Sequence, residues 1–163
     1  MANNPKPKYL IVDGYIKWAR LREEDKDTKF QEHGQYNAEF YPETQKELDK
    51  IVKEVTSRDK EINPKTPHDG VGYGVGKWVK VSRNHVHHKI EEFGGTPPVV
   101  KMDGETVAGD WDWNEDGVLG NGTKVRVKLV CYGSGRMSGM RLEKVGVLEH
   151  VPYDPEMQEA SGF

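Results

Sequence analysis

The chain has 163 residues, with 24 Lys and Arg against 27 Asp and Glu, which gives a formal net charge of −3. This length suits one domain that can bury its own core. No apolar run approaches the length of a membrane span, and the first residues lack the apolar stretch of a signal peptide, so we expect neither insertion nor export. The single cysteine, Cys131, indicates a reducing cytosol. The mild acidity taken alone argues against a nucleic-acid partner.

The charges are segregated along the chain. Basic residues outnumber acidic ones by five to one in 1–22, by four to none in 76–90, and by six to one in 123–145. Acidic residues dominate in 103–117, with six acids and no base, and in 149–163, with four acids and no Lys or Arg. Such segregation is typical of a polyanion-binding surface combined with acidic loops or an acidic tail. A solvated surface with unevenly distributed charges is the alternative.

Alternating apolar and polar residues predict strands along most of the chain. In the first strand, the alternation places Trp18 on the buried face, and in the second it turns Phe40 inward. In the last strand, the apolar positions shift register once, which predicts a β-bulge. In chain order, the predicted extended segments are 9–18, 34–41, 78–83, 94–100, a hairpin at 101–107 with its turn at Asp103-Gly104, 123–132 and 140–151.

One amphipathic helix interrupts this pattern. Pro42 suits the first turn of a helix, and the apolar stripe then follows at spacings of three and four residues. The stripe consists of Leu48, Ile51, Val52 and Val55. A connector rich in Pro and Gly follows at 63–76. Five or six short strands with one inserted helix predict a mostly β single domain, and a small closed barrel would hide the edges of so short a sheet.

Three motifs that would indicate a cofactor or a metal are incomplete. The glycine-rich stretch 70–78 has Val71 where a phosphate-binding loop requires its first Gly. The acidic stretch 110–121 has Glu115 where a calcium loop requires Gly. The histidine cluster at 85–88 has neither Cys nor a second ligand pair at metal-binding spacing. We therefore predict no catalytic residue, no cofactor and no metal.

Basic residues interleaved with aromatic ones are the remaining pattern. Single-stranded nucleic acid requires this combination, because cations follow the phosphates and flat rings stack on the bases. We predict that Tyr15, Tyr73 and Trp78 are exposed stacking residues, and that the 70–76 segment and the 133–139 loop flank the groove. The predicted contacts to the nucleic-acid backbone are Lys17, Lys77, Lys80, Arg83, Lys124, Arg126 and Lys128.

Three stretches, 94–107, 116–132 and 140–153, follow one another in a recognisable order. Within them, Gly-Asn-Gly-Thr at 120–123 enters the basic alternating strand at 123–132, and Leu142, Val145 and Val147 close the last strand. Lys29, Phe30, Gly34 and Tyr36 precede the helix. Together they resemble the phage-encoded single-stranded DNA-binding proteins with an OB fold.

This resemblance implies a five-stranded OB-type barrel over 9–153, preceded by a flexible N-terminus at 1–8. It implies a protein without enzymatic activity that coats single-stranded DNA during phage DNA replication, recombination and repair, in the cytoplasm of the infected bacterial host. It also implies homodimers and a C-terminal tail, here 154–163, that contacts phage DNA polymerase or helicase-primase. The tail residues are Asp154, Glu156, Glu159 and Phe163.

Two other functions share some of these features. A β-barrel adaptor that binds proteins would have the same fold without salt-dependent DNA affinity. A small metal-dependent nuclease would use carboxylates from the acidic stretch together with a histidine. The candidate ligands for that nuclease are Asp110, Asp112 and Asp116 with His85 or His88.

Overall fold

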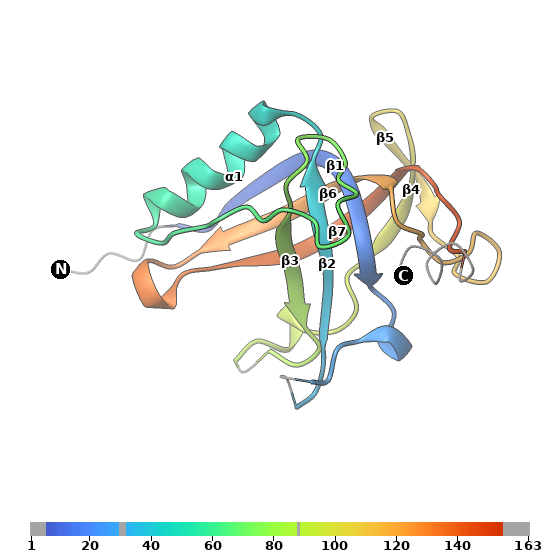
Figure 1. Cartoon of the computed structure of the whole chain (residues 1–163). Helices are drawn as coiled ribbons and strands as arrows, with labels where there is room; N and C mark the ends of the chain where they lie inside the picture. The colour runs from blue at the N-terminus through green and yellow to red at the C-terminus, as the bar shows by residue number, and fades with distance from the viewer. Residues whose placement is uncertain (1–5, 30–31, 88, 155–163) are drawn as a thin grey trace.

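Seven strands form one mixed sheet, and a single α-helix packs at one side of it (Figure 1). The structure is a computed structural model, and it describes residues 6–29, 32–87 and 89–154. The elements are β1 (Lys8–Arg20), β2 (Gln35–Pro42), α1 (Gln45–Ser57), β3 (Val79–Asn84), β4 (Val99–Asp103), β5 (Thr106–Asp110), β6 (Thr123–Tyr132) and β7 (Gly139–Glu149). This mostly β architecture with one helix confirms the predicted class.

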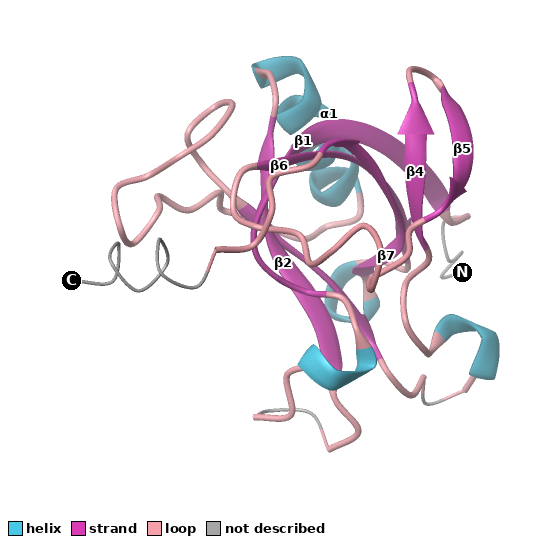
Figure 2. Ribbon diagram, turned by 90° about the vertical axis from the view of Figure 1, so that its right-hand side faces the viewer, coloured by secondary structure: helices cyan, strands magenta, loops and turns pink. Residues whose placement is uncertain are grey.

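The strands follow the order β3-β2-β1-β6-β7-β4-β5 across the sheet. All neighbours are antiparallel except β4 and β7, which run parallel. The sheet curls strongly, and the β4–β5 hairpin stands beside the curl as a separate arm (Figure 2). The expected closed, five-stranded barrel is therefore wrong in two respects, since the sheet has seven strands and it is not closed. The hairpin supplies the two extra strands.

The gap between β3 and β7 is spanned by the side chain of Arg83. Its guanidinium donates to the carbonyl oxygen of Leu142 on β7 at 3.4 Å. Three further bonds, of 2.8 to 3.0 Å, go to the carbonyls of Glu92, Gly94 and Gly95 in the segment that follows β3. The curl of the sheet is thus fixed at this point by one side chain in place of a strand ladder.

The core lies on the inner face of the curled sheet, under α1. The alternating positions of β1 and β6 fill it, and Val12, Val125, Val127 and Leu129 are each at most 1% exposed. Burial of such side chains contributes about 1.5–3 kcal/mol each. Cys131 is also fully buried and apolar in its surroundings, as predicted.

The helix begins three residues later than predicted. Thr44 is its N-cap, and the Thr44 side chain accepts a hydrogen bond from the amide of Glu47. Pro42 instead ends β2, where it pairs with Gly14 and its carbonyl accepts from the amide of Val75. The predicted apolar stripe is confirmed, because the helix buries Leu48 and Ile51 against the sheet. No helix among the described residues is long and apolar enough to cross a membrane.

The pairings of the long strands β1, β6 and β7 shift register at three places, and two of these shifts bear on the predictions. On β7 the pairing steps from Lys128↔Lys144 to Leu129↔Leu142, which leaves Glu143 as the extra residue and confirms the predicted bulge. On β1 the register shifts between Lys17 and Arg20. This second bulge turns Trp18 out of the core, so the prediction that Trp18 is buried is wrong, whereas Phe40 is fully buried as predicted.

Candidate nucleic-acid interface

Lys17 is buried in spite of its charge. Its side chain is 2% exposed, and its ammonium forms an ion pair with Asp69 and donates to the carbonyl of Val71 at 3.0 Å. Both partners belong to the glycine-rich connector, which crosses in front of β1 and β2 (Figure 1). Burial raises the pKa of Asp69, but the hydrogen bonds from Lys17 and from the Val71 amide outweigh it and lower that pKa overall. Lys17 is therefore not an exposed phosphate contact, contrary to the prediction.

The basic strand β6 is largely neutralised by acids from distant segments. Lys124 forms an ion pair with Glu43 at 2.9 Å, and this hydrogen bond raises the pKa of Lys124. Arg126 makes a two-pronged contact with Asp13, at 2.7 and 3.0 Å, which raises the pKa of the guanidinium. Both cations are half-buried. The positive potential expected from the sequence of this strand is correspondingly reduced.

Arg83 has a structural role in this fold. It is 7% exposed, and its hydrogen bonds go to backbone carbonyls on both sides of the gap between β3 and β7. Burial lowers its pKa, which the nearby carboxylate of Glu143 partly offsets. The prediction that Arg83 contacts the nucleic-acid backbone is wrong for this reason, because its donors already have partners inside the protein.

Three of the predicted cations are exposed and form no ion pair within the described part of the chain, namely Lys77, Lys80 and Lys128. They do not form one cluster. Lys80 lies level with Lys17 in the sheet, through Glu39 on β2, whereas Lys128 lies level with Ile11. Six residues of β1 separate those two rows, or about 20 Å of extended strand.

The predicted stacking residues differ in their surroundings. Tyr15 and Tyr73 stack on each other with ring centroids 5.8 Å apart, and Tyr41 meets Tyr73 edge-on at 5.6 Å. Tyr15 and Tyr73 are half-buried, so one face of each ring is already used. Trp78 is 8% exposed, and its indole donates to the carbonyl of Thr66 at 3.3 Å. The prediction that Trp78 lies on the surface is wrong, because the connector covers it.

Trp18, Tyr9 and Tyr153 are exposed aromatic residues that the predicted site lacks, and the sequence pattern predicts Trp18 in the core. Its side chain is 42% exposed, and its φ of 55° is in the left-handed region that non-glycine residues rarely adopt. The amide of Trp18 donates to the side-chain oxygen of Asn121 at 2.8 Å, which holds the bulge in place. Backbone strain of this kind often accompanies a functional site.

Trp18 lines a surface groove of about 440 Å³. Arg20 from β1 and Tyr153 from the end of the described chain lie along the same groove, and Tyr153 is 46% exposed. Arg22 and Lys26 also line it, but Arg22 is paired with Asp25 and Glu24, which line the groove as well, and Lys26 is paired with Glu23. The groove therefore offers two flat rings and, in Arg20, one cation that forms no ion pair within the described ranges.

Arg20 connects this groove with the outer face of β2 and β3. In the sheet Arg20 lies opposite Asn37, which lies opposite Ser82, and Lys80 occupies the neighbouring position on β3. These side chains point away from the core and are exposed or half-buried. The groove and this polar strip together form a continuous surface with aromatic, cationic and amide groups, which we call the β1–β3 surface.

The acidic loop and the histidines are used in local structure. Asp112 accepts from the amides of Asn114 and Glu115, at 2.9 and 3.1 Å, and Asp116 accepts from the amide of Asp112. His85 forms a 2.6 Å hydrogen bond with the hydroxyl of Tyr36. No group of three or more potential metal ligands gathers anywhere in residues 6–29, 32–87 and 89–154. His88, the other candidate of the nuclease hypothesis, lies outside the described residues.

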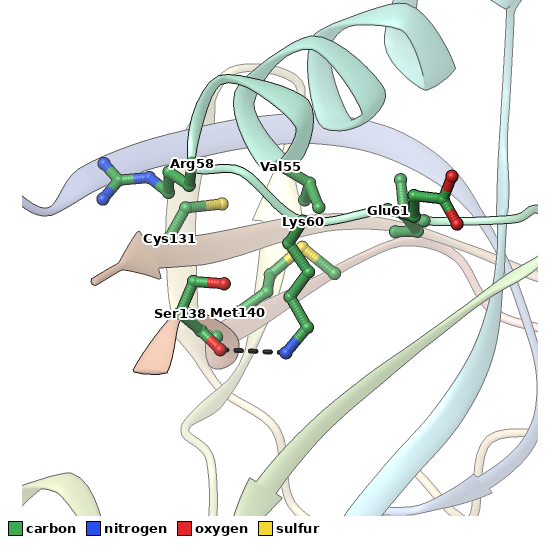
Figure 3. A pocket seen from close by; sticks show the side chains of 9 residues that line it. Val55, Arg58, Lys60, Glu61, Cys131, Ser138 and Met140 are labelled. Carbon is green, nitrogen blue, oxygen red and sulfur yellow. Dashed lines mark hydrogen bonds between the residues drawn. The ribbon is translucent and has the colours of Figure 1, made fainter. Parts of the chain in front are cut away.

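A separate cavity of about 170 Å³ opens between the end of α1 and strands β6 and β7 (Figure 3). Cys131 and Met140 form its apolar wall, and Lys60 bonds the carbonyl of Ser138 at its rim. Burial raises the pKa of the Cys131 thiol to about 11, so the thiol is protonated at neutral pH. This cavity has no part in the β1–β3 surface.

Most of the predicted tail lies outside the described residues. Asp154 is exposed, while Glu156, Glu159 and Phe163 lie outside the described residues, as does Phe30, which is part of the resemblance to the phage proteins.

Comparisons of the chain with protein-family models, with curated proteins and with solved structures found no match.

Proposed function

We propose that this protein binds single-stranded DNA without strong sequence specificity and has no enzymatic activity. In this proposal β1, β2, β3, β6 and β7 form an OB-type unit to which the β4–β5 hairpin is added. Their contiguous order β3-β2-β1-β6-β7 and the approach of β3 to β7 support this assignment, because the OB fold is a partly open barrel of five strands. Oligonucleotides bind such barrels on the face of the second and third strands.

The exposed indole of Trp18 carries the proposal. A bulge and a hydrogen bond to Asn121 hold this large apolar ring in solvent at a strained φ, beside Arg20. An aromatic ring beside a cation is suited to a stacked base with its phosphate, and each such stack contributes about 1–3 kcal/mol. Every base has a flat face, so this mode of binding is independent of sequence.

The proposed DNA contacts differ in part from those predicted from the sequence. Trp18 and Tyr153, in place of Trp78, stack on bases, and Arg20 joins Lys80 in contacting the DNA backbone. Lys77 remains a candidate because it is exposed at the end of the connector. We extend the proposal to coating of DNA during phage replication, recombination and repair in the infected host cytoplasm, with a homodimer and with polymerase or helicase-primase bound through the tail.

A tryptophan fluorescence titration with oligothymidylate tests the proposal. We expect quenching at low salt and much weaker binding at high salt, because bound phosphates release counterions. Trp18→Phe keeps a flat ring, so it should retain most of the affinity while losing most of the quenching. Trp18→Ala should weaken binding by about tenfold, as the loss of one stacked base predicts.

The controls separate this result from unfolding and from incidental charge effects. Lys53→Ala removes an exposed cation of α1, which is not part of the β1–β3 surface, and should leave affinity unchanged. Absence of any quenching or anisotropy change at low salt would refute DNA binding. Equal affinity of wild type and Trp18→Ala would refute this surface as its location.

A further inference from the structure

A second groove lies on the other half of the sheet, between the β4–β5 hairpin and the outer face of β6 and β7. It measures about 360 Å³. Figure 2 shows the hairpin standing beside the curled sheet. The groove shares no lining residue with the one beside Trp18. The proposed DNA-binding function therefore does not account for it.

The walls of the groove are aliphatic. Ile11 from β1 and Val107 from β5 are 56% and 53% exposed, and Met102 from β4 also lines the groove. The floor is Gly146, where a Cβ atom would lie 2.7 Å from the Met102 sulfur, so this glycine lets the methionine rest on the sheet. Apolar side chains so exposed on one face are typical of an interaction site.

The rim of the groove is cationic. Lys128 on β6 and Lys144 on β7 are direct neighbours in the sheet, and neither forms an ion pair with any residue in the described ranges. Arg126 closes one end by bonding Glu105 in the hairpin turn at 3.1 Å. The two lysines therefore present uncompensated positive charge along an aliphatic trough.

This chemistry selects one kind of occupant. Nucleic acid needs flat rings with free faces to stack on, and the lining contains only aliphatic, charged and glycine residues. The exposed ring next to the groove is Tyr9, and the ammonium of Lys128 already lies over it, 4.7 Å from the ring centroid. A second copy placed with the same face inward would bring the lysine pairs together, and like charges disfavour such contact. A protein segment with carboxylates and aliphatic side chains matches both the rim and the walls.

We propose that the groove beneath the β4–β5 hairpin binds an acidic segment of a partner protein whose aliphatic side chains rest on Ile11, Met102 and Val107 while its carboxylates pair with Lys128 and Lys144. This site is independent of the β1–β3 surface, so both can be occupied at once. The protein would then hold a partner beside the DNA that it covers.

Fluorescence anisotropy with a labelled short peptide tests this site. The probe alternates leucine with glutamate, and a second probe has lysine in place of each glutamate. We expect the acidic probe to bind and the basic probe not to bind. The double variant Lys128→Glu/Lys144→Glu should weaken binding of the acidic probe by about tenfold or more. The matched control Lys46→Glu/Lys53→Glu has the same change of net charge on exposed residues of α1 and should bind as wild type does.

Three further outcomes would each overturn the proposal. Equal binding of the two probes would show that the groove does not recognise acidic groups. Parallel losses of oligothymidylate and peptide binding in Lys128→Glu/Lys144→Glu would assign the groove to nucleic acid. A wild-type dimer in sedimentation that Ile11→Glu dissociates would assign this face to a second copy. Retained oligothymidylate binding in the double variant, with peptide binding lost, supports the proposal and leaves the function of the β1–β3 surface a separate question.

Discussion

The amide of Trp18 donates a hydrogen bond of 2.8 Å to the side chain of Asn121, across 103 residues of sequence. The bond ties the bulge in β1 to the turn that precedes β6. In the same turn the amide of Gly122, which has a positive φ of 92°, bonds the carbonyl of Ile16. The position of the indole is therefore set from outside its own strand, which makes Asn121 a positioning residue for Trp18.

Asn121→Ala should weaken oligothymidylate binding several-fold while lowering the free energy of unfolding by about 1 kcal/mol, the worth of one hydrogen bond. Asn121→Asp keeps the acceptor oxygen and should restore the position of Trp18. The emission maximum of Trp18, isolated by subtracting the spectrum of Trp18→Phe, reports that position. Unchanged emission and affinity in Asn121→Ala would contradict the positioning role.

The sequence predicts Trp78 on the surface and Trp18 in the core, and we expect mutations to show the reverse. Trp78 is buried, and Trp78→Ala should lower the free energy of unfolding by about 3–5 kcal/mol, as removal of a large core ring does. Trp18→Ala should cost less than that, because 42% of this side chain is already exposed to solvent. Urea unfolding followed by circular dichroism gives both values. A larger loss in Trp18→Ala would mean that the bulge places Trp18 differently.

The ion pair of Lys17 with Asp69 predicts an acid-sensitive part of the stability. The pKa of Asp69 is lower in the folded state than in the unfolded state. Asp69 therefore stabilises the fold at pH values above its unfolded-state pKa, and this stabilisation is lost as the pH falls through its folded-state pKa. Asp69→Asn should lower the free energy of unfolding by about 1–3 kcal/mol at about pH 7, since it removes the carboxylate that accepts a hydrogen bond from the buried ammonium of Lys17. The difference from wild type should shrink at about pH 2. A difference independent of pH would contradict this account.

Arg83→Lys should be nearly as damaging as Arg83→Met. One ammonium group cannot reach the four carbonyls that the guanidinium contacts, and buried carbonyls left unpaired cost about 1–3 kcal/mol each. We expect both variants to unfold at clearly lower urea concentration than wild type. The exposed neighbour variant Lys80→Met should unfold as wild type does, and full rescue by Arg83→Lys would indicate that charge alone matters.

Cys131 should react slowly with thiol reagents in the native protein. Its buried thiol has a pKa raised to about 11, so the reactive thiolate is scarce at neutral pH. The protonated Cys131 thiol stabilises the fold at pH values below the ordinary thiol pKa, and this stabilisation is lost as the pH rises toward 11. Reaction with a coloured disulfide reagent should be fast only in denaturant. Rapid modification of the native protein would show that the cavity beside α1 admits the reagent.

The regular parts of this fold could be predicted from the sequence. The alternation in 123–132 gives β6 with its observed bounds, the apolar stripe gives α1, and the register slip gives the bulge in β7. These features depend on the periodicity of neighbouring residues, which a sequence displays directly. The candidate site was much less predictable. In the sequence Trp18 falls at an alternating position that predicts a buried side chain, and the bulge in β1 turns it outward.

The basic residues show why the rest was out of reach. Lys17, Lys124 and Arg126 are paired with Asp69, Glu43 and Asp13, each of which lies far away in the sequence. Basic and acidic residues that are separated along the chain thus pair with each other in the fold, and counting charges in each stretch of sequence cannot reveal this pairing. The number of strands was underestimated because β5 is short and exposed on most of its length, so it has no apolar alternation.

The bond from Arg83 to Leu142 has a consequence for the mechanics of the sheet. A ladder would hold β3 and β7 along a line, whereas one guanidinium holds them at a point. Since β3 and β7 share no ladder among the described residues, a change in the distance between them would break side-chain contacts of Arg83 but no strand pairing.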